Sequence, residues 1–275
     1  MSGVSDGHAN EEFFGDDSQI AVSRRGAALS TLLADNPRFS YYGRLVTLGE
    51  PGEDSAVILT SLARLQGAGV SYYFPKKDAD AIAAQLVSLG FTTDRHEHYR
   101  GGEEAYKASL AVLAETELPG DLAVVRIGPE TSAGLVRQTA ELCIACGVQP
   151  IPGKVMRGMG PRGINLVAVD SKGRPVANGA SLYTMHPGSR RATDVFWGML
   201  ATREDRRGER IALILGAMAI RHMWEEEGAR GFCTGVRHDN LSSQKLCNRL
   251  GVTDTEWCHL ACIDKRVLGR ESFTR

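Results

Sequence analysis

Three arginines gather where a polar segment meets a long apolar one. Arg206, Arg207 and Arg210 surround Gly208 in the stretch RRGERIALIL. If a helix begins there, its first amide N–H groups lack partners and its dipole is positive, so each exposed arginine costs about 0.3–1 kcal/mol unless an anion binds. Glycine lets the backbone approach such an anion closely. The pattern therefore predicts a phosphate site.

Two common nucleotide motifs are absent, because neither G-x-x-x-x-G-K-[ST] nor a G-x-G-x-x-G at a strand-to-helix turn occurs. With 275 residues, a net charge of −1 and a pI near 6.7, the chain has no overall basic field. No apolar run approaches the ~20 residues of a membrane span. We therefore expect a local anion site and neither a nucleic-acid nor a membrane partner. Six cysteines in a chain of this length, without a leader-like start, favour a cytoplasmic location.

The elements that must position the arginines alternate along the C-terminal half. Hydrophobic patterning and turn residues predict strands at 122–127, 164–170, 175–185, 194–202, 231–237 and 256–264, and helices at 131–147, 207–227 and 240–251. Strand pairs beside strand–helix–strand units indicate an α/β (α+β) fold. We expect a mixed, mostly antiparallel central sheet flanked by helices.

The N-terminal half follows a similar plan. SYYFPKKDADAIAAQLVSLGFTTD (71–94) and GFCTGVRHDNLSSQKLCNRLGVTD (231–254) both predict a strand, a polar turn and a helix. GEDSAVIL (52–59) aligns with GERIALIL (208–215). We interpret the similarity as an internal repeat; the alternative is a chance match of two ordinary strand–helix units.

The repeat implies a division of the chain. Residues 1–18 are acidic and small, which predicts a disordered tail. A first domain is expected at 19–116 and a second at 121–275, with Pro119 and Gly120 marking the linker.

Two segments of the C-terminal half resemble the GNAT superfamily of acyl-CoA-dependent N-acyltransferases. The phosphate loop of that family, [QR]-x-x-G-x-[GA], is matched at Arg207 and Ala212, but its glycine is replaced by Arg210. The helix motif N-x-x-[AS]-x-x-L-Y-x-x-L-G-F is matched at Asn240, Ser243, Leu246, Leu250 and Gly251, with Cys247 in place of tyrosine and Val252 in place of phenylalanine. The resemblance covers about residues 121–264 and implies a GNAT-like fold, in two similar domains if the repeat is real.

The resemblance also implies an acetyl-CoA site. In the family, the backbone of the fourth strand pairs with pantetheine, the phosphate loop holds the pyrophosphate, and the following helix lies along pantetheine and adenosine. The corresponding positions are Leu200, Ala201 and Thr202; Arg206, Arg207, Gly208, Glu209, Arg210, Ile211 and Ala212; and Asn240 and Ser243. Lys245 or Arg249 are candidates for contacting the 3'-phosphate.

Catalysis in the family is direct attack of an amine on the thioester, assisted by a base and an acid. The family's acid is the tyrosine that Cys247 replaces. A thiol of pKa about 8.5 could protonate the leaving thiolate, or Cys247 could be only a core residue. Candidates for the base are Glu204, Asp194 and His186.

The N-terminal copy differs in charge at the corresponding loop. Glu50, Pro51 and Asp54 stand where the second copy has its arginines, and carboxylates repel phosphate. We therefore expect a degenerate domain that does not hold CoA and that walls the acceptor cleft of the active one. Arg157 and Arg162, in the connector 148–163, could offer charge to an acidic acceptor.

The resulting hypothesis is an N-acetyltransferase that uses acetyl-CoA and a small-molecule or peptide amine. A non-catalytic acyl-CoA sensor is the alternative, and an aminoacyl donor carried on RNA is disfavoured by the neutral charge. Cys143-x-x-Cys146 lacks a clear second ligand pair, so no metal is expected. A homodimer is left open.

Overall fold

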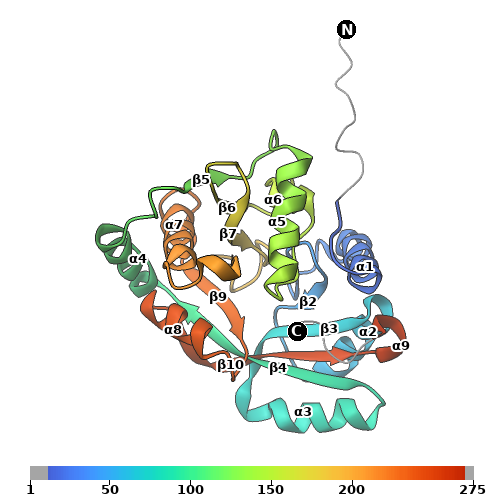
Figure 1. Ribbon diagram of the computed structural model, residues 1–275. Helices are drawn as coiled ribbons and strands as arrows, with labels where there is room; N and C mark the ends of the chain where they lie inside the picture. The colour runs from blue at the N-terminus through green and yellow to red at the C-terminus, as the bar shows by residue number, and fades with distance from the viewer. Residues whose placement is uncertain (1–11, 270–275) are drawn as a thin grey trace.

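Ten strands form one continuous sheet in the computed structural model, which describes residues 12–269 (Figure 1). The strand order is β1-β2-β3-β10-β4-β9-β8-β7-β6-β5. The strands are β1 (Phe39–Tyr41), β2 (Val46–Leu48), β3 (Ala68–Pro75), β4 (Thr92–Gly101), β5 (Ala123–Arg126), β6 (Gly163–Val169), β7 (Pro175–Tyr183), β8 (Asp194–Thr202), β9 (Gly231–Val236) and β10 (Thr253–Ile263).

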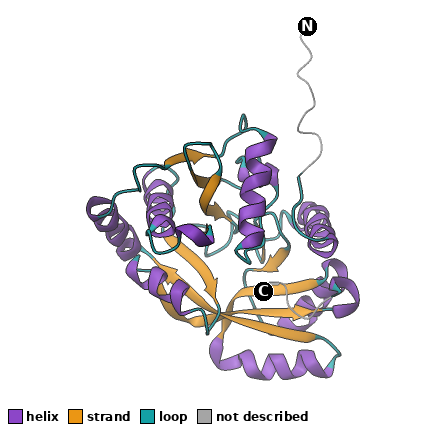
Figure 2. Cartoon of the chain, viewed as in Figure 1, coloured by secondary structure: helices purple, strands orange, loops and turns teal. Residues whose placement is uncertain are grey.

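Helices flank the sheet, as Figure 2 shows in purple around the orange strands. They are α1 (Asp17–Leu33), α2 (Ser55–Gln66), α3 (Lys76–Ser88), α4 (Glu103–Glu115), α5 (Ala133–Ala145), α6 (Gly153–Met156), α7 (Ile211–Glu225), α8 (Leu241–Arg249) and α9 (Lys265–Leu268), with a 3-10 turn η1 (Glu204–Arg206). Neighbouring strands are antiparallel except for the pairs β2–β3 and β8–β9. The predicted fold class, a mixed and mostly antiparallel sheet with flanking helices, is confirmed.

Separate hydrophobic clusters pack α5 and α7 against the strands β6, β7 and β8. The first joins α7 and α4 to residues such as Val195 and Trp197, whose indole Nε1 donates to the Gly216 carbonyl at 3.0 Å. The second joins α5 and α6 to residues such as Met199 and Ala201. Alternating side chains of the strands thus bury apolar area on both faces, which is the main stabilising term of such a layered fold.

The last strand of the chain lies among strands of the N-terminal half. β10 pairs with β3 on one side and β4 on the other, and β4 pairs with β9. The ranges 19–116 and 121–275 therefore contribute strands to one sheet. Their division into two domains remains a prediction.

The predicted tail at 1–18 is wrong for the residues that the structure describes, and residues 1–11 lie outside them. Asp16 caps α1 by accepting from the Gln19 amide at 3.0 Å, and the Gln19 side chain accepts from the Asp16 amide in return. This capping box begins a helix within the acidic segment. Glu12 also forms an ion pair with Arg157, and its carbonyl accepts from the Gly153 amide at 2.8 Å.

The predicted start of the long helix at residue 207 is also wrong. α7 begins at Ile211, because η1 occupies residues 204–206 and Arg210 has a left-handed backbone with φ of 61°. A right-handed helix cannot continue through a residue in that conformation. The other predicted strands and helices of the C-terminal half are present, with ends that differ by a few residues.

The position of β10 generates a test. A fragment of residues 1–116 is expected to lack a cooperative thermal transition in circular dichroism, because β3 and β4 lose the strand that lies between them and expose unpaired backbone groups. Residues 253–269, fused after residue 116 through a flexible linker, should restore the transition. Cooperative melting of the shorter fragment would contradict the argument.

Candidate active site

A cavity of about 770 Å³ opens where two parallel strands diverge. β8 and β9 stay in register only as far as the pair Phe196 and Cys233, although β8 continues to Thr202 and β9 to Val236. Beyond that pair the two strands no longer pair with each other, and residues of both line the cavity. The divergence leaves a gap in the middle of the sheet, which a ligand can enter without displacing a side-chain core.

The start of α7 closes one end of this cavity. In the described chain, the amides of residues 208–213 have no acceptor, and the first bonded amide is that of Ile214, which donates to the Arg210 carbonyl at 3.1 Å. Gly208 has φ of +87°, a left-handed conformation that glycine adopts without strain. The unbonded amides are a set of donors at a helix N-terminus, which is a position suited to an anion with several oxygens.

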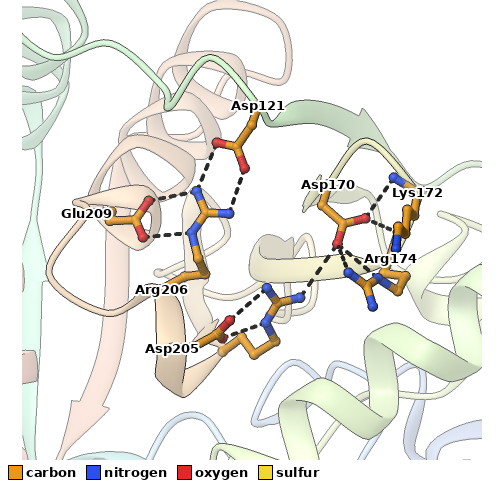
Figure 3. Close-up of polar contacts among 8 residues, drawn as sticks. Asp121, Asp170, Lys172, Arg174, Asp205, Arg206 and Glu209 are labelled. Carbon is orange, nitrogen blue, oxygen red and sulfur yellow. Dashed lines mark hydrogen bonds and ion pairs between the residues drawn. The ribbon is translucent and has the colours of Figure 1, made fainter.

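The three arginines of this loop differ in their surroundings. Arg207 and Arg210 line the cavity, are exposed, and form no ion pair within residues 12–269. Arg206 is held between two carboxylates (Figure 3): Glu209 accepts from it at 2.7 Å and Asp121 at 2.9 and 3.0 Å. These bonds raise the pKa of Arg206, Glu209 contributing most. Arg206 therefore fixes the loop, and the two others remain available to a ligand.

Neighbouring ion pairs hold the base of the same loop. Arg203 donates to Asp205 at 2.6 and 3.0 Å, and Asp170 bonds Arg174 at 2.9 Å (Figure 3). The Arg174 hydrogen bond is the main reason that the pKa of Asp170 falls to about 2. Arg203 also forms an ion pair with Asp170 at 3.8 Å, which connects the start of η1 to the β6–β7 turn.

A bulge in β8 exposes backbone to the cavity. β7 pairs Asn178 with Ala201 but Ala180 with Gly198, so Met199 and Leu200 have no partner in the register, and Met199 has φ of 57°. The extra residue also reverses the alternation of the strand, since Val195 and Trp197 belong to the α7 cluster whereas Met199 and Ala201 belong to the α5 cluster. Leu200, Ala201 and Thr202, the predicted pantetheine contacts, line the cavity beside it.

The predicted helix residues reach the cavity from α8. Asn240 caps this helix by accepting from the Ser243 amide at 3.0 Å, and both residues line the cavity. Cys247 also lines it but is 3% exposed, and burial raises the pKa of its thiol to about 12. A thiol with that pKa is a poor proton donor to a leaving thiolate, so its surroundings favour the packing role.

The three predicted bases lie away from the cavity. Glu204 is exposed on η1, and the His186 Nδ1 accepts from the Gly188 amide at 2.9 Å in the loop after β7. Asp194 is buried, and its carboxylate is held by Arg100 at 2.7 and 3.0 Å and by the Tyr73 hydroxyl at 2.9 Å. None of the three is among the lining residues.

Side chains from the N-terminal half and β10 wall the cavity instead. They are Tyr42, Arg44, Tyr72, Asp94, His96 and His259. Burial lowers the pKa of His259 well below its usual range and keeps this ring neutral at physiological pH. The spacing of Asp94, His96 and His98 at every second residue was a usable signal, because it puts three polar side chains on one face of a strand.

Neither a metal-ligand cluster nor a membrane-spanning helix occurs within residues 12–269. No group of three or more His, Cys, Asp and Glu side chains in that range could hold a metal ion. No helix there is both long and apolar enough to cross a bilayer.

Solved structures with this architecture are recognisable despite low identity. A GCN5-related N-acetyltransferase from Kribbella flavida has 14% identity and a TM-score of 0.57, with 88% of this chain and 95% of that one covered. A Drosophila protein has 13% identity and a TM-score of 0.53 over 90% and 89%. A tandem GNAT protein from the clavulanic acid biosynthesis pathway has 17% identity and a TM-score of 0.50 over 73% and 66%.

No protein-family model and no curated protein sequence matches the chain. The structural similarities show that the chain has the fold of the GNAT superfamily. This agrees with the family that its two sequence segments resemble.

The backbone of Arg210 generates a stability test. Arg210→Gly is expected to be neutral or to raise the free energy of unfolding by up to about 1 kcal/mol, because glycine relieves the left-handed strain while adding disorder to the unfolded chain. Lys245→Gly, at an exposed position inside α8, should lower it by about 0.5–1 kcal/mol. Urea unfolding measures the free energy of unfolding of both variants. If both variants lost the same amount of stability, the left-handed strain at Arg210 would be refuted.

Proposed function

We propose that the protein is an acyl-CoA-dependent N-acyltransferase that moves the acetyl group of acetyl-CoA to a primary amine. The observation that carries this proposal is the row of unbonded amides at residues 208–213, which opens into the same cavity as the bulge of β8. Pyrophosphate supplies oxygens that can accept hydrogen bonds from such a row of amides. The GNAT fold of the chain supports the same assignment.

The residues that line the cavity suit the individual parts of acetyl-CoA. Arg207 and Arg210 would neutralise the pyrophosphate, and the unpaired backbone around Leu200 would hydrogen-bond the amide groups of pantetheine. Asn240 and Ser243 would lie along the pantetheine and adenosine side. Arg206 and Glu209 would act indirectly, since they bond each other and set the shape of the loop.

In the proposed reaction, the amine nitrogen attacks the thioester carbonyl carbon, the carbon–sulfur bond breaks, and an amine proton ends on the thiolate. His96 is a candidate to carry that proton. It lines the cavity, and its Nε2 is buried, lies 3.6 Å from an Asp94 carboxylate oxygen and forms no hydrogen bond within residues 12–269. Glu204 and His186 stay hypotheses that would need the loops carrying them to move.

A non-catalytic acyl-CoA-binding protein is the second candidate. It is favoured by Cys247, which stands in place of the family's tyrosine and whose thiol has a pKa of about 12. Release of CoA in the presence of a panel of amines separates the two functions. Tight binding of acetyl-CoA without release from any amine would support the binding protein.

Binding of acetyl-CoA is tested by thermal melts. At ~100 times its dissociation constant the ligand should add about 2.7 kcal/mol to the stability of the wild type. Arg207→Glu should abolish the shift, because it reverses a charge beside the free amides. Arg221→Glu is the control, since Arg221 is exposed on the same helix outside the cavity lining. A wild-type protein whose melt does not respond would refute the proposal.

The role of Cys247 is tested by turnover. Cys247→Ala is expected to keep kcat within about threefold, because a thiol of pKa about 12 is poorly matched to proton donation near neutral pH. Since Cys247 is buried, the free energy of unfolding of the variant, measured in urea, should be roughly 1–2 kcal/mol lower than that of the wild type. A loss of kcat by a hundredfold or more, with acetyl-CoA affinity unchanged, would instead identify Cys247 as the acid.

A further inference from the structure

Arg44 is a buried cation that faces the cavity. It lies in the loop between β1 and β2, and 8% of its surface is exposed. Its guanidinium contacts neutral groups: the Gln149 carbonyl, the Met199 Sδ at 2.6 Å and the Tyr42 hydroxyl at 3.4 Å. Its Nε has no hydrogen-bond partner, and it forms no salt bridge with a carboxylate of residues 12–269. Burying a charge without a counter-ion is costly.

Arg157 provides a comparison within the same chain. It is 4% exposed, but it pairs with the Glu12 carboxylate and also donates to the Thr131 carbonyl at 3.3 Å. The connector's other candidate, Arg162, pairs with Glu227 at 2.9 Å. Arg157 and Arg162 therefore already have carboxylate partners and lie outside the cavity lining, whereas Arg44 lies in it and has none.

Other buried polar atoms around the cavity also form no hydrogen bond within residues 12–269. They are Gln149 Oε1, His96 Nε2 and His259 Nε2, all on lining residues. Aromatic rings stand beside them: Tyr42 stacks on Phe196 with centroids 4.8 Å apart, and Tyr72 contacts His259 at 4.6 Å. This wall offers the positive charge of Arg44, polar atoms without hydrogen-bond partners and an apolar surface, and it also carries the Asp94 carboxylate, which lies 3.6 Å from His96.

Arg44 lines the same cavity as the loop at residues 206–213, but it contacts β8 on the face opposite α7. Met199, which it contacts, packs with the α5 cluster, whereas the residues of α7 pack in the other cluster. The free amides of residues 208–213 already provide an anion site at the start of α7. An anion bound by Arg44 would therefore be a different one, on the side of the diverging strands away from α7.

We propose that Arg44 binds a carboxylate of the acceptor, so that the substrate is an amine that also carries a carboxylate, such as an amino acid. The inference rests on the proposed transferase function and names its acceptor class. A guanidinium presents parallel N–H groups that match the two oxygens of a carboxylate. The carboxylate of the acceptor would supply the counter-ion that the buried Arg44 lacks.

The first experiment compares acids with their amides on the wild type. CoA release is measured for α-amino acids and for ω-amino acids of two to six carbons, each beside its carboxamide. At least one acid should exceed its amide in kcat/KM by tenfold or more. Equal values throughout, with acetyl-CoA turned over, would overturn the assignment of Arg44 and leave the transferase function standing.

Variants of Arg44 then test whether this residue causes the preference for the acid over its amide. Arg44→Met should raise KM for the preferred acid at least tenfold and remove the preference, while the Kd for acetyl-CoA stays within threefold. Arg44→Lys should keep part of the preference. Arg157→Met is the matched control, expected to lose stability but to retain the preference. If Arg44→Met weakens acetyl-CoA more than tenfold and leaves the preference intact, Arg44 binds the cofactor and the proposal is wrong.

If no amine is acetylated, measurements of ligand binding test the proposal. Thermal melts of the wild type with each acid in the presence of CoA then decide. A shift with an acid, absent with its amide and lost in Arg44→Met, would support the carboxylate site and overturn the transferase function. Absence of any such shift would overturn the carboxylate site as well.

Discussion

The divergence of β8 from β9 after Phe196 and Cys233 is the constraint on which the site depends. Two parallel strands that stop pairing leave backbone groups without partners in the middle of a sheet, and such groups are costly unless something bonds them. Here the cavity gives them access to a ligand. The bulge at Met199 adds to this by removing two residues from the β7 register as well.

Arginine performs different tasks around this gap, and its neighbours decide which. Arg206 is neutralised by Glu209 and Asp121 and shapes the phosphate loop, whereas Arg207 and Arg210 remain open to an anion. Arg44 is buried against neutral atoms on the side away from α7. The chain is nearly neutral overall, so its positive sites are created locally by the absence of a carboxylate partner.

The N-terminal half contributes walls to this cavity. Its loop at residues 50–54 carries carboxylates that are already engaged: Glu50 accepts from Ser189, and Asp54 from Arg38 at 2.6 and 2.9 Å. Its strands β3 and β4 enclose β10, and from that surface Tyr72, His96 and His259 reach the cavity. Sharing one sheet keeps these side chains at a fixed distance from β8.

Much of the fold could be predicted from local pattern. The Asn240 cap, the Ser132 cap and the hairpin between β6 and β7 follow from residues a few positions apart, and each is present. The proposed phosphate loop was predicted in the same way, since helix starts and the charges beside them are local features. The capping box of Asp16 is also a local pattern, but the acidic composition of residues 1–18 led to the prediction of a disordered tail instead.

Only the tertiary structure decided which groups meet. Asp121 reaches Arg206 across 85 positions of sequence, and Arg44 meets Met199 across 155. The left-handed backbone of Arg210 and the bulge at Met199 were not indicated by any local sequence pattern. The sequence by itself therefore determined the order of elements in the C-terminal half and the cluster of arginines just before the long helix, because short-range hydrogen bonding and periodicity control the elements. Long-range burial and ion pairing determined which arginines stay free and which side chains wall the cavity.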